Sequence, residues 1–257
     1  MITCAPNPQS LIKAAILQQL TGLQPQMKIV EQQLNLFAAS ENILADDFQF
    51  AKLINELSAK TNRNYSWLDR NSGHRIAVMI LFNLRNNRNA SDSVIFPALS
   101  EAFQQGPGAC IYGRGPFSSV FRRRSREVGN EIHRMLGLIR FAETTYGDLV
   151  TRPKLFHCTA DLLLKKFQLR FPGRRLVFLL PEGALCCYQS QLFFIARQDL
   201  PSSVLNPKDD FEQLWETYYR SQYIPERKNI RLATHFIPKK YWDWLSEGKI
   251  LEQESRN

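Results

Sequence analysis

Apolar residues recur at helical spacing through most of the first hundred residues, with polar residues at the positions between them. An apolar residue at every third or fourth position marks a helix with one buried face. The pattern predicts helices at 9–20, 47–60, 74–84 and 92–104. Asp46 or Asp47 would cap the second of them. Ser91 or Asp92 would open the fourth, and Gly106 would close it, so residues 1–105 read as a mostly helical lobe.

Beyond residue 116, helical spacing alternates with short apolar runs that are typical of strands. Helices are expected at 117–137, 158–170, 209–223 and 238–246. Strands are expected near 138–142 and 146–152, and as a pair at 174–180 and 184–196. This order predicts an α+β protein, in which the domain at 117–248 contains a small antiparallel sheet packed by helices and residues 249–257 form a polar tail.

The segment 106–116, GPGACIYGRGP, is rich in glycine and proline and is expected to interrupt regular structure. It is the most natural boundary between the two lobes. The alternative is a functional loop, because glycines allow a backbone to approach a phosphate closely. The lysine and the following Ser or Thr of a P-loop are absent, so the motif does not decide between these two interpretations.

The chain has 257 residues, 44% of them hydrophobic, which is enough to bury a core without disulfides or bound metals. Its five cysteines are scattered, and none has the CxxC or Cys/His spacing that zinc or iron–sulfur ligation requires. They are expected to be reduced thiols, with one of Cys186 and Cys187 facing the core. We therefore predict no metal site and no cofactor.

No signal peptide is expected at the start of the chain, because glutamines such as Gln18 and Gln19 interrupt its apolar stretch. No apolar run is long enough to cross a bilayer. The sequence therefore predicts a cytoplasmic protein without a membrane partner.

The net charge of +9 and the pI near 9.4 favour a polyanionic partner such as nucleic acid. The excess is local: residues 1–60 have four basic and five acidic side chains, whereas residues 112–140 have seven basic and two acidic ones. In the helix expected there, Arg123, Arg126 and Asn130 share a face, and His133 and Arg134 continue it. An apolar stripe on the same helix would face the core, so the basic face could meet phosphates.

A second basic cluster lies at 227–240 and contains no acidic residue. Aromatic residues flank it, including Trp215 and Tyr219 before it and Trp242 after it. Cations interleaved with aromatic rings suit the binding of unpaired bases. The alternatives are that the aromatic rings are core anchors and that the basic side chains form a solvated face without a partner.

The segment LWETYYRSQYIPERKNIRLATHFIPKKYWDWLSEG, from Leu214 to Gly248, resembles the C-terminal signature of the domain-of-unknown-function family 4130. VGNEIHRMLGLIRF, from Val128 to Phe141, and RFPGRRLVFLLPEG, which begins at Arg170, are similar to two earlier segments of that family. The resemblance implies a role in DNA repair or modification. It also implies a partner enzyme, such as a radical SAM protein or a uracil-DNA glycosylase.

No nucleophile elbow, HExxH, Walker or dinucleotide-binding motif is present, so whether the protein is an enzyme stays open. The best acid–base candidate is His133, which arginines surround in the sequence. We expect a DNA-binding protein that is accessory to a partner enzyme. The alternatives are an enzyme that acts on a damaged or modified nucleobase through His133 and nearby arginines, and a protein-interaction subunit with a basic surface. The residues expected to contact nucleic acid are Arg122, Arg123, Arg124, Arg126, Arg134, Arg140, Arg227, Lys228, Arg231, Lys239, Lys240, Tyr241 and Trp242.

Overall fold

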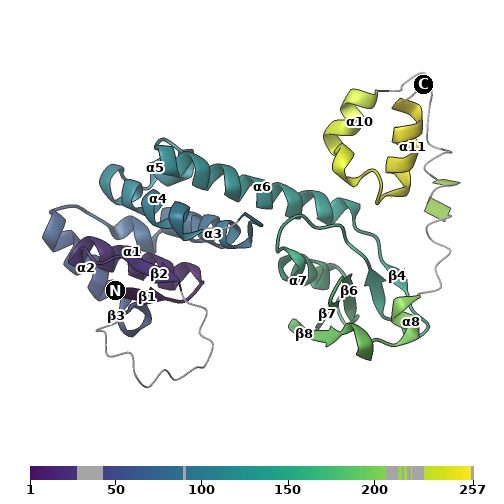
Figure 1. Ribbon diagram of the computed structural model, residues 1–257, viewed down its shortest axis with the longest axis horizontal. Helices are drawn as coiled ribbons and strands as arrows, with labels where there is room; N and C mark the ends of the chain where they lie inside the picture. The colour runs from purple at the N-terminus through teal and green to yellow at the C-terminus, as the bar shows by residue number, and fades with distance from the viewer. Residues whose placement is uncertain are drawn as a thin grey trace. The chain divides into compact units, whose positions relative to one another are not determined.

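The computed structural model describes residues 1–27, 43–88, 91–206 and 229–255, together with 214–215, 217–218 and 221. The chain forms two compact units, Met1–Asn130 and Glu131–Asn257 (Figure 1). The division falls within helix α6 (Pro116–Leu138) and not in segment 106–116, where the structure has a short helix, α5 (Gly108–Tyr112). The combination of helices with two small sheets makes this an α+β protein, as the sequence predicted.

Unit 1 packs helices around a three-stranded parallel sheet of order β2–β1–β3. Its elements, besides α5 and the start of α6, are β1 (Ile2–Cys4), α1 (Pro8–Thr21), β2 (Pro25–Met27), β3 (Ile43–Leu44), η1 (Ala45–Asp47), α2 (Phe50–Thr61), η2 (Ser66–Asp69), α3 (Asn71–Arg85) and α4 (Asp92–Gln105). The helices predicted from the periodicity are all present. The sheet was not predicted, because strands of two or three residues are too short to show an alternating pattern.

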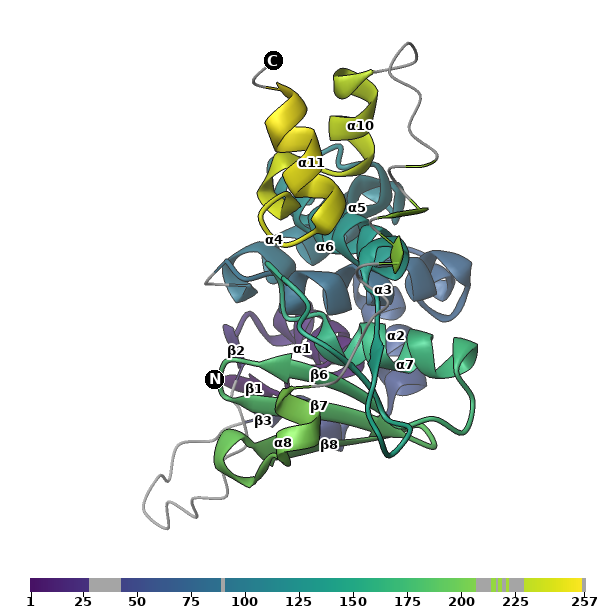
Figure 2. The same ribbon diagram turned by 90° about the vertical axis from the view of Figure 1, so that its right-hand side faces the viewer.

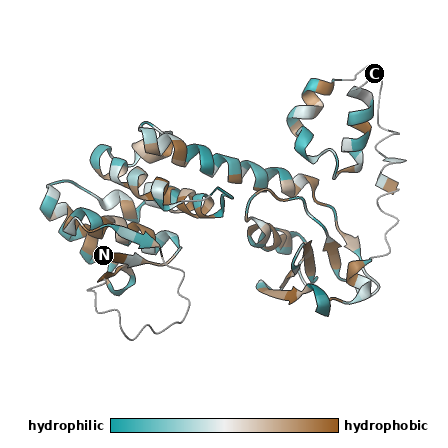
Figure 3. Cartoon of the chain, viewed as in Figure 1, coloured by the Kyte–Doolittle hydropathy of each residue, from teal (hydrophilic) through white to brown (hydrophobic). Residues whose placement is uncertain are grey.

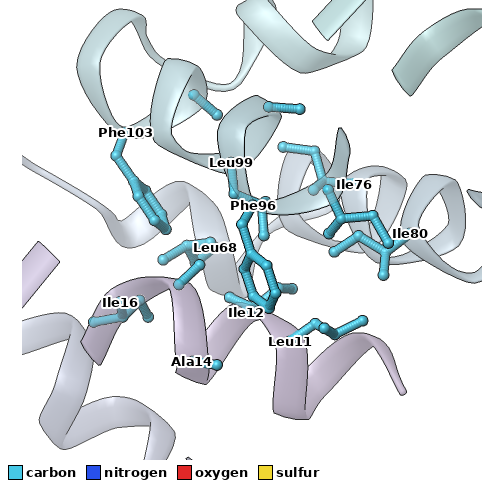
Figure 4. Packing of buried hydrophobic residues seen from close by; sticks show 14 of the residues in the cluster. Leu11, Ile12, Ala14, Ile16, Leu68, Ile76, Ile80, Phe96, Leu99 and Phe103 are labelled. Atoms are coloured by element: carbon cyan, nitrogen blue, oxygen red, sulfur yellow. The ribbon is translucent and has the colours of Figure 1, made fainter. Parts of the chain in front are cut away.

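Helix α1 is the centre of unit 1. Residues from Ser10 to Leu17 are all buried, because α2, α3 and α4 pack around them (Figure 4). The Asn7 side chain accepts a hydrogen bond from the Ser10 amide at 2.9 Å, and Gly22 ends the helix in the left-handed conformation at φ 77°. These are the residue types that helix termini favour.

Asp46 does not cap α2, contrary to the sequence prediction. Helix α2 begins at Phe50, and Asp46 lies in η1. There its carboxylate accepts a hydrogen bond from the Ser10 hydroxyl at 3.0 Å, and its carbonyl accepts one from Lys13 Nζ at 3.3 Å. Asp46 therefore joins the loop before α2 to the buried helix α1.

Unit 2 contains a five-stranded sheet of order β4–β5–β6–β7–β8. Figure 2 shows β6, β7 and β8 side by side. All neighbours are antiparallel except β5 and β6, so the sheet is mixed and not wholly antiparallel. The elements that follow α6 are β4 (Ala142–Glu143), β5 (Leu149–Thr151), α7 (Ala160–Arg170), β6 (Leu176–Leu180), β7 (Gly183–Tyr188), β8 (Gln191–Ala196), η3 (Arg197–Asp199), α8 (Ser202–Leu205), α10 (Ile230–Phe236), η5 (Lys239–Tyr241) and α11 (Ser246–Ser255).

Three predicted elements of unit 2 differ from the structure. The run 184–196 is a hairpin and not one strand, because Gln189 and Ser190 both adopt positive φ and turn the chain. The range 238–246 holds the short 3-10 helix η5 in place of a longer α-helix, and α11 occupies most of the expected polar tail. The helix expected at 209–223 lies mostly outside the described residues, and the residues described within it are helical.

The central strands of this sheet are buried on both faces. Cys186 packs with Val177, Leu200 and Val204 on one face, while α7 contacts β6 and β7. Cys187 is also buried, so both members of the pair are in the core and not one alone.

The thiols of this protein are expected to differ strongly in reactivity. Burial raises the pKa of Cys110 to about 12 and the pKa of Cys4 and Cys186 to about 11, so these thiols stay protonated at neutral pH. Cys158 is exposed and free. Because the thiolate is the reactive form, iodoacetamide at about pH 7.5 should label Cys158 first.

Mass spectrometry of timed samples, with and without urea, measures this difference. A Cys158→Ser variant should lose the fast adduct and keep the others. Equally fast labelling of Cys110 in the folded protein would contradict the expected burial of its thiol.

Candidate nucleic-acid interface

The N-terminus of α6 is closed by a carboxylate from α4. Glu101 accepts hydrogen bonds from the backbone amides of Phe117 at 3.1 Å and Ser118 at 2.8 Å. A side chain at Gly115 would collide with this carboxylate, since an added Cβ would lie 2.2 Å from Glu101 Oε2. The glycine therefore permits the approach of Glu101. The amides that a phosphate cradle would use are already bonded, which disfavours that interpretation of segment 106–116.

Helix α6 divides into an apolar and a basic face, as its periodicity predicted. Phe121, Val128 and Met135 are fully buried along the helix. Arg123 and Arg126 are exposed. Figure 3 shows hydrophilic residues along much of this helix.

Three arginines of α6 line a surface hollow of about 410 Å³ in unit 1. They are Arg122, Arg123 and Arg126, and the hollow is completed by Gly113, Ser119, Glu127 and Asn130. Helical spacing brings Ser119 beside Arg122 and Arg123 one turn further on. Backbone, hydroxyl, amide and guanidinium groups thus border one concave surface, which we call the α6 hollow.

The charge of the α6 hollow is not neutralised from within the described part of unit 1. Its one carboxylate, Glu127, accepts hydrogen bonds from Arg88 Nη2 at 3.3 Å and from Asn86 Nδ2 at 3.3 Å. No ion pair joins Arg122, Arg123 or Arg126 to any described residue. The three guanidinium groups therefore present their donors to an external anion.

Arg122 of the hollow is half-buried, and two other arginines of α6 are also less accessible than expected. Arg124 is half-buried, and its Nε and Nη1 atoms are buried without a hydrogen-bond partner in the described part of the chain. Arg134, in unit 2, is also half-buried. Helical spacing explains this placement, because Arg124 lies about 100° around the helix from Arg123.

The described residues of the second basic cluster are exposed, but two of them have contacts within the protein. Arg227 and Lys228 lie outside the described residues, whereas Arg231, Lys239 and Lys240 are exposed. The ammonium of Lys239 lies 5.6 Å from the ring centroid of Trp242, and that of Lys240 lies 4.0 Å from the ring of Phe156. Both lysines therefore have cation–π contacts within the protein.

Tyr241 and Trp242 were expected to contact bases, but the structure places both in the core of unit 2. Tyr241 is fully buried and meets Phe156 edge to face, and the Trp242 indole donates a hydrogen bond to the Ile237 carbonyl at 2.7 Å. Burial is the main reason that the pKa of the Tyr241 phenol is raised. These rings are core anchors, which was the alternative interpretation of the aromatic pattern.

Arg140 is held inside unit 2 by two partners. Its guanidinium forms an ion pair with Glu247, which is buried, and lies 4.2 Å from the ring centroid of Trp215. The Trp215 indole donates to the same carboxylate at 2.8 Å. Arg140 therefore links three distant segments of the chain and is not a free phosphate ligand.

His133 is exposed on α6 and has no hydrogen-bond partner among the described residues. A general base normally needs a group that orients it, and none is placed here. The carboxylates near it in sequence are engaged separately: Glu143 with Arg174, and Asp148 with Arg175. No group of three or more potential metal ligands occurs in the part of the chain that the structure describes. In the same residues, no helix has the length and apolar character needed to cross a membrane.

Comparison with known proteins identifies the family. A family model described as a domain of unknown function, DUF4130, matches residues 89–247, and the chain belongs to this family. The matched range contains the α6 hollow and almost all of unit 2. No curated protein and no solved structure matches the chain significantly.

Sequence reasoning found the arginines of the hollow but missed the residues that complete it. Ser119 could have been found, because it precedes Arg123 by one helical turn. Gly113 could not, since it comes from outside the helix and its position depends on packing.

Proposed function

We propose that this protein binds DNA through the phosphate backbone, with the α6 hollow as the main contact. The observation that carries the proposal is the group of three arginines, Arg122, Arg123 and Arg126, which border one concave surface and form no ion pair with any described residue. Guanidinium groups bind phosphate oxygens with paired hydrogen bonds, and their charge displaces condensed counterions. Such contacts position a nucleic acid but carry little sequence information.

In this proposal the protein is accessory to a partner enzyme that acts on DNA, such as a radical SAM protein or a uracil-DNA glycosylase. The role in DNA repair or modification that the resemblance of the segments around Arg140 and Trp242 implies motivates this proposal. His133 lacks an orienting partner in the described residues, which favours binding over catalysis by this chain. The alternative of a nucleobase-modifying enzyme gains no support from the geometry.

A salt titration tests the binding. Fluorescence anisotropy with labelled oligonucleotides of about 20 nucleotides, single-stranded and duplex, would be measured between about 50 and 200 mM salt. We expect the logarithm of the binding constant to fall linearly with the logarithm of the salt concentration, with a slope of about −2 or steeper. Three phosphate contacts require such a slope, because each of them releases counterions. Two unrelated base sequences should give similar affinities. Absence of binding at the lowest salt concentration, or binding that does not respond to salt, would reject the proposal.

A further inference from the structure

Unit 2 contains a pocket of about 490 Å³. None of the residues that line it belongs to the α6 hollow. The pocket is bordered by the end of α6, strands β4 and β5, the end of α8 and the turn before α11. Its volume is in the range of small-molecule sites, which is about 300–1,000 Å³. Val150, Leu179 and Leu245 contribute apolar surface, and all three are buried residues.

Two tryptophans form part of the wall, and each is fixed by a hydrogen bond. The Trp244 indole donates to the Arg152 carbonyl at 2.8 Å, and the Trp215 indole donates to Glu247 Oε1 at 2.8 Å. The stacked guanidinium of Arg140 supports Trp215. Tryptophan side chains that are held in this way lose little conformational entropy when a ligand binds. This favours the recognition of a rigid planar group.

The polar groups at the pocket are cationic or neutral. Among the described residues that line it, none is acidic, and Arg140 and Arg152 are both basic. Glu247 balances Arg140, whereas Arg152 only donates to the Leu205 carbonyl at 2.7 Å and has no ion pair with a described residue. Arg152 therefore keeps its charge and further donors for an anion.

Thr151 and Asn206 add hydrogen-bonding groups to the same lining. The amide of Asn206 can both donate and accept, as can the hydroxyl of Thr151. An apolar pocket with aromatic walls, a cation and such groups matches a planar heterocycle that carries a phosphate.

We propose that this pocket binds a single unstacked nucleotide, with the base between the walls formed by Trp215 and Trp244 and the phosphate beside Arg152. The inference deepens the proposed DNA binding and rests on it. The contacts proposed for the phosphate backbone would hold the DNA strand, and one nucleotide of that strand would enter the pocket. A base that enters such a pocket must first leave its stack, which is least costly in single-stranded or damaged DNA.

The test uses the full chain and free deoxynucleoside 5′-monophosphates, with 2-deoxyribose 5-phosphate as the probe that lacks a base. Tryptophan fluorescence and calorimetry measure binding. Arg152→Gln removes the phosphate partner, and Thr151→Phe fills the pocket. Each change should weaken nucleotide binding by at least about tenfold, the loss expected for one stacking or charged contact.

Arg197→Gln is the matched control. Arg197 is an exposed arginine of the same unit that also donates to a backbone carbonyl, that of Pro181, and it does not line the pocket. This variant should bind nucleotides like the unaltered protein. Near-ultraviolet circular dichroism checks that the variants remain folded, and Arg152→Gln alone decides the outcome if Thr151→Phe unfolds.

The two proposals fail in different ways. If oligonucleotides bind with the expected salt dependence but free nucleotides do not bind at millimolar concentration, the pocket proposal is overturned and the α6 proposal stands. Equal affinity for deoxyribose phosphate and for nucleotides would also overturn the pocket proposal, because the base would then contribute nothing to binding. Nucleotide binding that both variants weaken and Arg197→Gln leaves unchanged supports the pocket, even if oligonucleotides fail to bind.

Discussion

Replacing Arg122, Arg123 and Arg126 together by glutamine is expected to weaken DNA binding about 10- to 100-fold at low salt and to reduce the salt slope by about 2 to 3. These side chains border the α6 hollow and have no ion-pair partner in the described residues. Each lost charge removes one phosphate contact and the counterion release that accompanies it. Anisotropy titrations at several salt concentrations measure both quantities.

The control must remove the same charge from elsewhere. A Lys52→Gln, Arg70→Gln and Arg75→Gln variant does this with exposed residues of unit 1 that do not line the hollow. This variant is expected to lose less than about threefold in DNA affinity, since its substitutions change only the long-range electrostatic field of the protein. Equal losses in both triple variants would show that total charge, and not the α6 hollow, controls binding.

Replacing Glu131 by alanine is expected to lower the stability of unit 2 by about 3–5 kcal/mol. Glu131 is 1% exposed, and its carboxylate accepts three hydrogen bonds. The donors are the Phe156 amide at 2.8 Å, the His157 amide at 3.1 Å and the Thr159 hydroxyl at 2.9 Å. Without the carboxylate, the buried Thr159 hydroxyl and the two partly buried amides lose their acceptor, which costs more than the bonds themselves contributed.

Urea unfolding followed by tryptophan fluorescence measures this loss, because Trp215, Trp242 and Trp244 all belong to unit 2. Glu143→Gln is a suitable control. Its ion pair with Arg174 is solvent-exposed, so the free energy of unfolding should change by less than about 1 kcal/mol. If Glu131→Ala unfolds at the same urea concentration as the control, the bonds around residues 156–159 do not stabilise the unit as the structure indicates.

The family signature segments acquire a physical explanation in the structure. Arg140 comes from one signature segment, and Trp215 and Glu247 come from the two ends of another; they meet in one ion pair, one ring contact and one hydrogen bond. Their shared role is to form and support one wall of the pocket in unit 2. The signature thus reflects both the core and a candidate ligand site.

The sequence by itself determined the long helices and the basic face of α6. Periodicity suffices there, because the burial of residues such as Val128 and the exposure of Arg123 follow from their positions around a single helix. It also identified the family, since the signature segments are continuous in sequence. The α+β class followed from the same local patterns.

Only the tertiary structure decided which polar and aromatic groups are free to bind. Tyr241 and Trp242 are in the core, and Arg140 is neutralised by Glu247, although the sequence pattern suited all three to nucleic acid. The hairpin turn at Gln189 was missed because its residues are not the usual Asn-Gly pair. Burial and pairing depend on contacts between residues far apart in the chain, and these contacts also form the pocket beside Arg152. Local spacing cannot determine such contacts, because each of them depends on how whole elements pack.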